Sequence, residues 1–436
     1  MQIQLYLIFG IIQLVQNVPL DATFKEKPLW IRQKLDHFNK SDTRTWKMRY
    51  LASDRYYKPG GPLFINVGGE WEVTYKDVLI GLYYELVKEF NAYSACTEHR
   101  YYGKSQPRPN WSVENLKYLD IKQALADLAH FIRHKRKTIP GMQNAKVVLF
   151  GCSYAGTMSI YFKREYPDLA AGIWAAGAPV WYRLDYSDGN VSIGKALRIV
   201  GGDPCYDRIE NTTLTYLKLK KLKDNHILRD LKAKNITKGL EEIDMVTAVN
   251  IQHRNRTYLD KFCKTLVSFD NNDLVGMATY LTKELGKIPE MGSYNGTKIN
   301  HESFGRQWLY QQCNGFGNFQ TTSSMHQPFG NKSPFTKQVD RCRKEFGPKY
   351  TIDYVNSKID EMNVKFGGYQ PGIQNAYYTF SDLDPWRLTG IHDERATIIP
   401  GIGHCHEMRV RSEKDWPATK AAKQKGIDLI RSWINA

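Results

Sequence analysis

The sequence predicts an α/β fold in which helices cover both faces of a doubly wound, mostly parallel sheet. Three observations support this prediction. Apolar strand-like runs alternate with helix-like runs between residues 63 and 180, as expected when helices connect parallel strands. The segment 146–167 joins an apolar strand to a helix through a turn of small residues around Ser153. After a long polar interval, strand-like runs return at 376–380 and 396–399.

The chain has 436 residues and a net charge of +16, with 42% hydrophobic and 24% charged residues. This composition is typical of a folded protein, and the length suits one enlarged α/β domain or a core with an insertion. The positive charge could indicate an acidic partner, but no nucleic-acid-binding motif accompanies it. We interpret the densest basic stretch, residues 218–238, as the solvated face of a helix.

The N-terminal residues 1–15 are mostly apolar, but the run is too short and too interrupted by glutamine to span a bilayer comfortably. It fits a secretory signal peptide, which we place at residues 1–20 with the cleavage site left open, or else an ordinary buried segment. Eight N-x-S/T sequons also favour the secretory route, since these sequons are sites of N-glycosylation in secreted proteins. They begin at Asn39, Asn110, Asn190, Asn211, Asn235, Asn255, Asn295 and Asn331.

The seven cysteines include no C-x-x-C pair, so the pattern does not support a zinc site or a thioredoxin-type site. Disulfide bonds formed in an oxidising compartment are expected instead. Because the number is odd, at least one thiol is left unpaired or pairs with another chain.

The first strand of the alternation is expected at 63–67, after a Pro-Gly turn. Gly68 and Gly69 follow it directly, where a backbone N–H can contribute to an oxyanion hole; a plain turn is the alternative. The polar residues 98–100 are interpreted as a hydrogen-bonded structural cluster. A helix is expected at about 120–133, because apolar residues recur there every three or four positions.

Ser153 lies in residues 151–156, which read G-C-S-Y-A-G. A serine at a sharp strand-to-helix turn is typical of the nucleophile of α/β-hydrolases, whose pattern is G-x-S-x-G. Here alanine stands at the last position and Gly156 follows it. A serine that caps a helix is the alternative. If Ser153 is the nucleophile, the backbone N–H of Tyr154 is one oxyanion donor, and Gly68 or Gly69 lies near the other.

Acyl transfer by serine also needs a base and an acid that orients the base, and α/β-hydrolases supply them in the order Ser, Asp, His. The loop after the strand at 376–380 offers Asp382 or Asp384. The loop after the last strand offers His404 or His406. We favour Asp384, because the Pro-Trp pair that follows it stiffens the loop, and His404, because it comes first after two glycines. Turn caps and surface loop residues are the alternatives.

The interval between the two groups of strands is polar and helix-like and carries most of the sequons. We expect it to be a helical lid over the carboxyl ends of the strands, where ligands bind in open α/β folds. The predicted organisation is a signal peptide (1–20), a first part of the hydrolase core (27–182), the lid (183–335) and a second part of the core (336–436).

Several motifs are spread over nearly the whole chain: residues 35–38 (L-D-H-F), 98–105 (E-H-R-Y-Y-G-K-S), 123–128 (Q-A-L-A-D-L), 153–156 (S-Y-A-G), 319–322 (F-Q-T-T), 383–386 (L-D-P-W) and 404–405 (H-C). Together they resemble the serine peptidase family of lysosomal prolylcarboxypeptidase and dipeptidyl peptidase II, most closely its thymus-specific serine protease branch. The resemblance implies an α/β-hydrolase fold with a helical lid and exopeptidase activity on short peptides, commonly after proline. It assigns Ser153 as nucleophile, Asp384 as acid and His404 as base.

The chain departs from that family in three places. Cys152 stands where a glycine is usual, the loop before Asp384 is shorter, and residues 314–315 are Asn-Gly where Thr-Glu is frequent. The resemblance further implies two disulfide bonds, Cys205–Cys263 and Cys313–Cys342.

The predicted function is therefore that of a secreted or lysosomal serine exopeptidase without a cofactor or metal. Another acyl hydrolase on the same fold, such as an esterase, is one alternative. A catalytically silent binding glycoprotein is the second, and the intact set Ser153, Asp384 and His404 speaks against it. The expected partners are peptide substrates, without nucleic acid and without an integral membrane span; a homodimer is left open.

Overall fold

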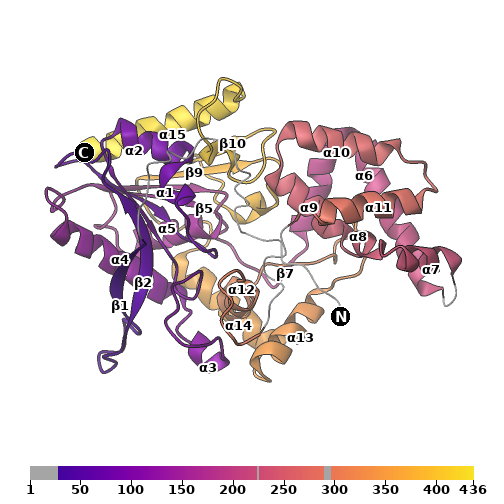
Figure 1. Ribbon diagram of the computed structural model, residues 1–436, viewed down its shortest axis with the longest axis horizontal. Helices are drawn as coiled ribbons and strands as arrows, with labels where there is room; N and C mark the ends of the chain where they lie inside the picture. The colour runs from indigo at the N-terminus through magenta and orange to yellow at the C-terminus, as the bar shows by residue number, and fades with distance from the viewer. Residues whose placement is uncertain (1–27, 223–224, 289–295) are drawn as a thin grey trace.

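The computed structural model describes residues 28–222, 225–288 and 296–436. The predicted signal peptide and the sequon at Asn295 lie outside these residues. Figure 1 shows a body built on a sheet and, on its right, a lobe of helices. The sheet has eight strands in the order β1-β2-β4-β3-β5-β6-β9-β10. Their bounds are β1 Leu29–Lys34, β2 Thr45–Ser53, β3 Leu63–Val67, β4 Tyr93–Thr97, β5 Val147–Cys152, β6 Gly172–Ala176, β9 Ala376–Ser381 and β10 Ala396–Ile399.

The strands from β4 to β10 pair in parallel, and this confirms the predicted α/β-hydrolase class of fold. β3 and β10 match the strands expected at 63–67 and 396–399. The edge pair β1 and β2, which is antiparallel, was not predicted. β1 buries a polar residue, Gln33, beside Ile31, so apolar and polar residues do not alternate cleanly along it. The Gln33 side chain donates to the backbone oxygen of Asp127 at 2.9 Å.

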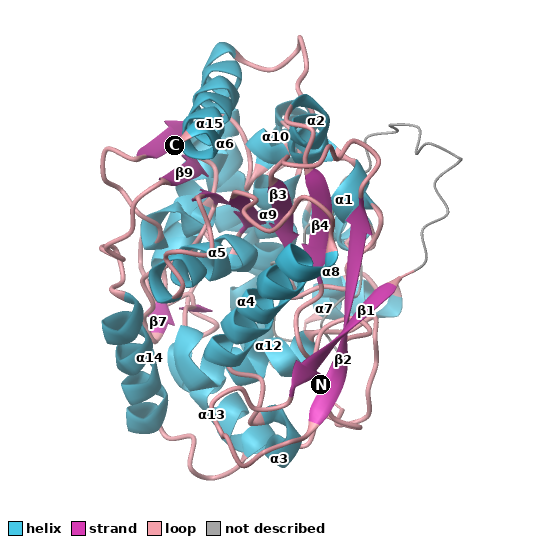
Figure 2. Cartoon of the chain, turned by 90° about the vertical axis from the view of Figure 1, so that its left-hand side faces the viewer, coloured by secondary structure: helices cyan, strands magenta, loops and turns pink. Residues whose placement is uncertain are grey.

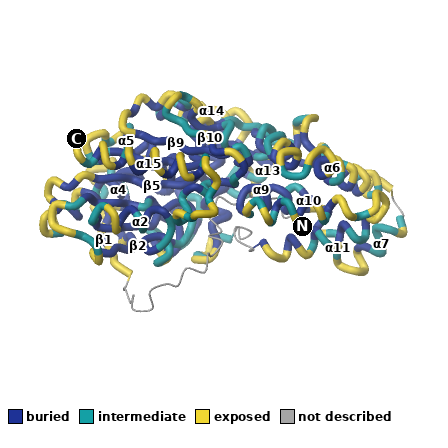
Figure 3. The backbone as a smooth tube through the Cα atoms, turned by 90° about the horizontal axis from the view of Figure 1, so that it is seen from above, coloured by how far each residue is buried: buried dark blue, intermediate teal, exposed yellow. Residues whose placement is uncertain are grey.

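Alternate side chains of the central strands point to opposite faces of the sheet and enter two separate apolar clusters. On one face, Leu149 and Ile173 pack with the helices α4 and α5. On the other face, Phe150 and Trp174 pack with the helices α2 and α15. Figures 1 and 2 show these helix pairs on the two sides of the sheet, and Figure 3 shows the strands buried between them. The helices are α1 Lys76–Leu79, α2 Gly81–Glu89, α3 Val113–Leu116, α4 Ile121–Thr138, α5 Tyr154–Glu165 and α15 Pro417–Asn435.

Between β6 and β9 the described residues add no strand to the main sheet, only a short parallel pair, β7 and β8. The lobe on the right of Figure 1 consists of the helices α6 to α11, and α12 to α14 lie below the sheet. The limits predicted for a lid, 183 and 335, stay a prediction. The elements are β7 Asp185–Tyr186, α6 Asp188–Lys221, α7 His226–Ala233, α8 Thr237–Glu241, α9 Ile243–His253, α10 Arg256–Ser268, α11 Leu274–Leu285, α12 Gly305–Gln311, the π-helix η1 Gln312–Phe316, β8 Phe319–Gln320, α13 Phe335–Phe346, α14 Ile352–Phe366 and the 3-10 helices η2 Pro385–Thr389 and η3 His406–Met408.

Disulfide bonds hold both parts of the molecule. Cys205–Cys263 joins α6 to α10, and Cys313–Cys342 joins η1 to α13; these are the pairs that the resemblance implies. A third bond, Cys152–Cys405, links residues 253 positions apart in the sequence. Cys96 is a buried free thiol. No described helix is long and apolar enough to cross a membrane.

The sequons differ in accessibility. Asn190 is buried, and its side-chain amide donates to the backbone oxygen of Thr321 at 2.8 Å. An oligosaccharide on that nitrogen would break this hydrogen bond, so the burial of Asn190 disfavours glycosylation there, and glycosylation at Asn190 stays a prediction. Asn110 is half-buried. The exposed sequon asparagines are Asn39, Asn211, Asn235, Asn255 and Asn331.

Candidate active site

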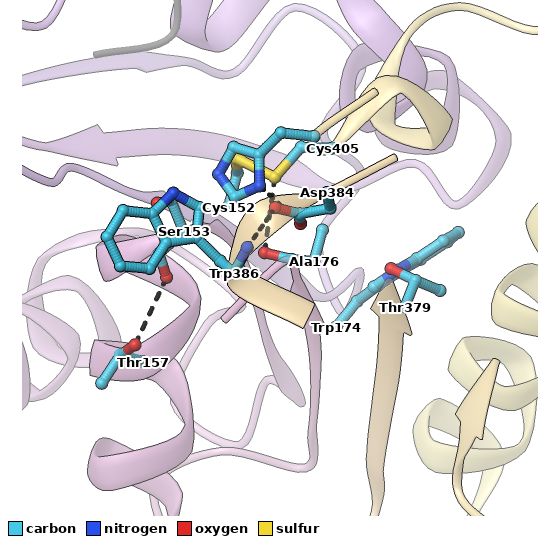
Figure 4. The surroundings of a disulfide bond; sticks show 10 residues. Cys152, Ser153, Thr157, Trp174, Ala176, Thr379, Asp384, Trp386 and Cys405 are labelled. Atoms are coloured by element: carbon cyan, nitrogen blue, oxygen red, sulfur yellow. Dashed lines mark hydrogen bonds and ion pairs between the residues drawn. A yellow bond between two sulfur atoms is a disulfide. The ribbon is translucent and has the colours of Figure 1, made fainter. Parts of the chain in front are cut away.

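The candidate site lies at the carboxyl ends of four neighbouring parallel strands. Ser153 follows β5, and Gly177 follows β6. Asp384 lies in the loop after β9, and His404 in the loop after β10. Because β5, β6, β9 and β10 are adjacent in the sheet, their loops meet at one edge although more than half the chain separates the first from the last. Figure 4 shows Ser153 and Asp384 in this small space.

Ser153 occupies the sharp turn between β5 and α5. Its φ of 58° lies in the left-handed region, which a residue with a side chain adopts only under strain. The turn is tight because a Cβ at Gly151 would lie 2.3 Å from the backbone oxygen of Ala155. A Cβ at Gly156 would lie 2.9 Å from the Cβ of Ala178. Gly156, not position 155, therefore provides the close approach between the helix and β6.

Asp384 and His404 form a buried pair. Oδ2 of Asp384 lies 2.7 Å from Nδ1 of His404. Its other oxygen, Oδ1, accepts the backbone N–H of Trp386 at 2.9 Å. The carboxylate thus keeps the proton of the imidazole on Nδ1, which leaves Nε2 as the nitrogen that can accept a proton. The shorter loop before Asp384 does not prevent this contact.

The two alternative residues make structural contacts. Oδ1 of Asp382 accepts the backbone N–H of Gly401 at 2.7 Å and so holds the loop after β10. Nε2 of His406 lies 3.2 Å from the backbone oxygen of His253. Burial lowers the pKa of His406 well below its usual value. Both residues support the loop that carries His404, but neither joins the Asp384–His404 pair.

Oγ of Ser153 is buried and has no hydrogen-bond partner within the described residues. The sulfurs of Cys152 and Cys405 and a ring nitrogen of His404 all lie within 4.8 Å of one another. The residue before the serine and the residue after the histidine therefore meet, which places the two loops side by side. Because the sulfurs are joined to each other, they offer no thiolate to a metal ion.

The proposed oxyanion donors lie at two strand ends. The N–H of Tyr154 is at the start of α5, where backbone N–H groups of the first turn lack helical partners and favour negative charge. Gly68 and Gly69 follow β3, the neighbour of β5. A Cβ at Gly68 would lie 2.0 Å from the backbone oxygen of Thr97, so only glycine fits this path.

Comparison with known proteins agrees with this arrangement. The sequence model of the family described as "Serine carboxypeptidase S28" matches residues 33–426. The chain belongs to this family. It is a serine-type peptidase of the α/β-hydrolase fold, and its substrates are peptides.

Relatives of this S28 peptidase include the lysosomal Pro-X carboxypeptidase of Mus musculus, which is 38% identical over 94% of the chain and 89% of the relative. The thymus-specific serine protease of Mus musculus is 24% identical over 93% of the chain and 87% of the relative. Among solved structures, the proline iminopeptidase of Mycobacterium smegmatis has a TM-score of 0.40 at 12% identity, with 89% of this chain and 96% of that chain covered. A structural likeness this distant decides nothing further.

Two features of the S28 peptidase around the site were missed in the sequence. The first is the contact between the helical lobe and the base. The backbone N–H of His404 donates to the oxygen of Gln252 at 2.9 Å, and the rings of His253 and His404 meet edge to face at 6.4 Å. Both partners belong to the end of α9. No sequence signal predicts this contact, because it depends on how the lobe packs on the body.

The second missed feature is a buried polar chain behind the nucleophile elbow. The hydroxyl of Tyr154 lies 2.9 Å from Nε2 of His99 and accepts the amide of Gln311 at 2.9 Å. Tyr102 donates to the oxygen of the same amide. Nδ1 of His99 lies 2.7 Å from the backbone oxygen of Arg100, which can only accept, so Nδ1 carries the proton. Burial lowers the pKa of His99 to about 4 and keeps the ring neutral.

The cluster at residues 98–100 therefore has structural partners, as expected. Glu98 pairs with Arg49 at 2.5 Å, and Arg100 pairs with Asp127 at 2.7 Å. All four groups are buried, and a buried charge needs a partner of this kind. Through His99, the same cluster fixes the ring of Tyr154, whose backbone N–H is the proposed oxyanion donor.

Proposed function

We propose that the protein is a serine exopeptidase of short peptides in which Ser153 is the nucleophile, His404 the general base and Asp384 the acid that orients it. The observation that carries this proposal is the buried contact of 2.7 Å between Asp384 and His404, beside a serine in a strained strand-to-helix turn. A structural serine cap would not need the left-handed conformation of Ser153.

In the proposed reaction, Nε2 of His404 takes the proton of Ser153 while Oγ attacks the peptide carbonyl carbon. The negative oxygen that develops is stabilised by the N–H of Tyr154 and by an N–H of Gly68 or Gly69. His404 then gives the proton to the leaving amine, and the acyl-enzyme forms. Water, deprotonated by the same histidine, releases the acyl group. Asp384 stabilises the imidazolium in both steps.

The position of the helical lobe supports action on short peptides. The end of α9 contacts the loop of His404 through the Gln252 oxygen, so the lobe covers part of the edge where the strands end. A partly covered edge of this kind favours short peptides or chain ends over long folded chains as substrates.

We further propose that the enzyme cleaves next to proline. Support comes from the relatives named lysosomal Pro-X carboxypeptidase, one of which shares 38% identity over nearly the whole chain. Profiling the cleavage of a peptide library by mass spectrometry tests this proposal. Cleavage that ignores proline would reject it, and release of residues from one end of the chain would tell carboxy- from amino-terminal action.

The catalytic assignment is tested by labelling with a fluorophosphonate probe. The wild type should be labelled and should lose the label in Ser153→Ala, because the probe reacts only with an activated serine. Absence of labelling in the wild type would favour a silent binding glycoprotein. A labelled enzyme that hydrolyses p-nitrophenyl acetate but no member of the peptide library would not be the proposed exopeptidase.

We also propose that the protein acts in the secretory pathway, as a secreted or lysosomal enzyme. Three disulfide bonds and five exposed sequon asparagines support this location, because such bonds persist in oxidising compartments. A homodimer stays a prediction. Immunofluorescence of the tagged full chain tests the location. Analytical ultracentrifugation tests whether the protein is a dimer.

A further inference from the structure

We propose that the disulfide bond Cys152–Cys405 is a positioning element of the active site, and that its reduction switches the peptidase to a slow state. The inference rests on the proposed function, because it assumes that Ser153 and His404 react together. It concerns neither the fold of the lobe nor the choice of substrate.

The connectivity of the bond is the first argument. Cys152 is the last residue of β5 and directly precedes Ser153, while Cys405 directly follows His404. The bond thus ties the nucleophile to the base through one residue on each side, across 253 positions of sequence. The two loops follow β5 and β10, which are not neighbours in the sheet, because β6 and β9 lie between them. Pairing between strands therefore does not join the two loops directly, whereas the disulfide bond does.

The surroundings of the bond are the second argument. Both sulfurs lie within 4.8 Å of a ring nitrogen of His404, so the bridge forms part of the wall against which the imidazole packs. Sγ of Cys405 lies 3.4 Å from the backbone oxygen of Ala176, and that oxygen also accepts the N–H of Ser153 at 2.8 Å. Figure 4 shows Ala176 beside Cys152, Cys405 and Asp384. One backbone oxygen therefore contacts both the bridge and the nucleophile turn.

The conformation of the two loops is the third argument. Cys405 has a φ of 57° and Ser153 a φ of 58°, so each loop holds a non-glycine residue in the left-handed region. Such conformations persist only where the surrounding structure enforces them. A covalent bond between the two loops is one such constraint, and it acts together with the close packing of the elbow at Gly151 and Gly156.

Reduction of the bond follows ordinary thiol–disulfide exchange. A thiolate of a dithiol reductant attacks one sulfur and displaces the other cysteine as a thiolate, which takes up a proton. The second thiol of the reductant then displaces the remaining cysteine and closes a cyclic disulfide. The protein gains two thiols, and the dithiol is oxidised by two electrons. Cys152 is almost fully buried and Cys405 half-buried, so attack through the Cys405 sulfur is the accessible route.

The test compares two double variants of the full chain, each lacking one disulfide. Cys152→Ser/Cys405→Ser removes the bridge at the site, and Cys205→Ser/Cys263→Ser removes the bridge between α6 and α10. Active sites are counted by fluorophosphonate titration, and kcat is expressed per titrated site. We expect kcat per site to fall by about 10²-fold in the first variant. In the second it should stay near the wild-type value, even if the melting temperature falls.

Dithiothreitol, with a chelator present, should slow the wild type to the rate of the first variant and leave that variant unchanged; reoxidation should restore the wild type. The chelator matters because two thiols and the imidazole could capture a stray metal ion. The pH profile of kcat/KM should also shift, because the base is no longer held in place. An unchanged kcat per site and pH profile in the first variant would overturn the inference. If that variant fails to fold, an unchanged kcat per site in the wild type after reduction would overturn the inference instead. Since titration itself requires an active serine, failure of the proposed function would appear earlier, as an unlabelled wild type.

Discussion

Gly177 lies directly against the imidazole of His404. A Cβ at position 177 would be 2.5 Å from Cε1 and 2.6 Å from Nδ1 of that ring, and 3.0 Å from Oδ2 of Asp384. The glycine also has a φ of 55°. The backbone just after β6 therefore packs directly against the acid–base pair. Only a residue without a side chain leaves room there for the contact between Asp384 and His404.

Gly177→Ala should consequently reduce kcat by about 10²-fold or more, because the methyl group displaces the ring from its position. Gly60→Ala is the matched control: Gly60 also has positive φ, at 91°, but nothing lies within 4 Å of a Cβ there. Both variants should lose about 1 kcal/mol of stability from backbone strain. Steady-state kinetics and thermal unfolding measure the two effects separately. Equal kcat values in the two variants would contradict the role assigned to Gly177.

Asp384→Asn should lower kcat by about 10⁴-fold with little change of KM, because an amide cannot hold the proton of His404 on Nδ1. Asp382→Asn tests the alternative acid at nearly the same place in the sequence. The side chain of that residue accepts the N–H of Gly401, and an amide oxygen can still do so. Its kcat should stay within about tenfold of the wild type, since an orienting contact is weakened and none in the acid–base pair is lost. The reverse order of effects would reassign the acid.

In the strand-to-helix turn around Ser153, Ala155 stands where the motif G-x-S-x-G has its second glycine. Two variants test whether Gly156 takes over the role of that glycine. Gly156→Ala should destabilise the fold and reduce activity, because its Cβ would lie 2.9 Å from Ala178 and 3.0 Å from the Gly151 oxygen. An overpacked core position loses about 1–3 kcal/mol. Ala155→Gly should lower stability by only about 1 kcal/mol through helix propensity. Unfolding in urea and fluorophosphonate labelling compare the two; a greater loss at position 155 would be inconsistent with the packing.

His99 predicts a pH dependence of stability. Its pKa is about 4 in the folded protein against 6.5 for a free imidazole, so below pH 6.5 the unfolded chain binds a proton that the folded chain does not. The stabilisation is complete above pH 6.5 and is lost as the pH falls toward 4, by about 3 kcal/mol in all.

The measurement is the free energy of unfolding of the wild type minus that of His99→Asn, at pH 7 and at pH 4. The difference should shrink by the stated amount at the lower pH. Burial raises the pKa of Asp77 to about 6, which works in the opposite direction, but this residue is present in both proteins and cancels in the difference. A difference independent of pH would show that His99 is not buried in the neutral form.

The amino-acid sequence by itself determined the parallel core and the order of the candidate catalytic residues. Strands that are buried on both faces are rich in apolar residues, so β3 and β5 were evident from their residues alone. The motifs around Ser153, Asp384 and His404 are local in sequence, which made the family resemblance visible. The edge strand β1 was missed because a buried glutamine breaks its apolar alternation.

Only the tertiary structure revealed the contacts between segments that are far apart in the sequence. The sequence favoured Asp384 over Asp382 and His404 over His406, and the fold shows the contacts: the side chains of Asp384 and His404 meet, whereas those of Asp382 and His406 contact backbone groups. The contact of Gln252 with His404 and the closeness of Gly177 arise from packing between parts far apart in the chain. The bond Cys152–Cys405 depends on both the local sequence and the fold. Each cysteine is the immediate neighbour of a candidate catalytic residue, but only the fold shows that the two loops bring their sulfurs into bonding distance.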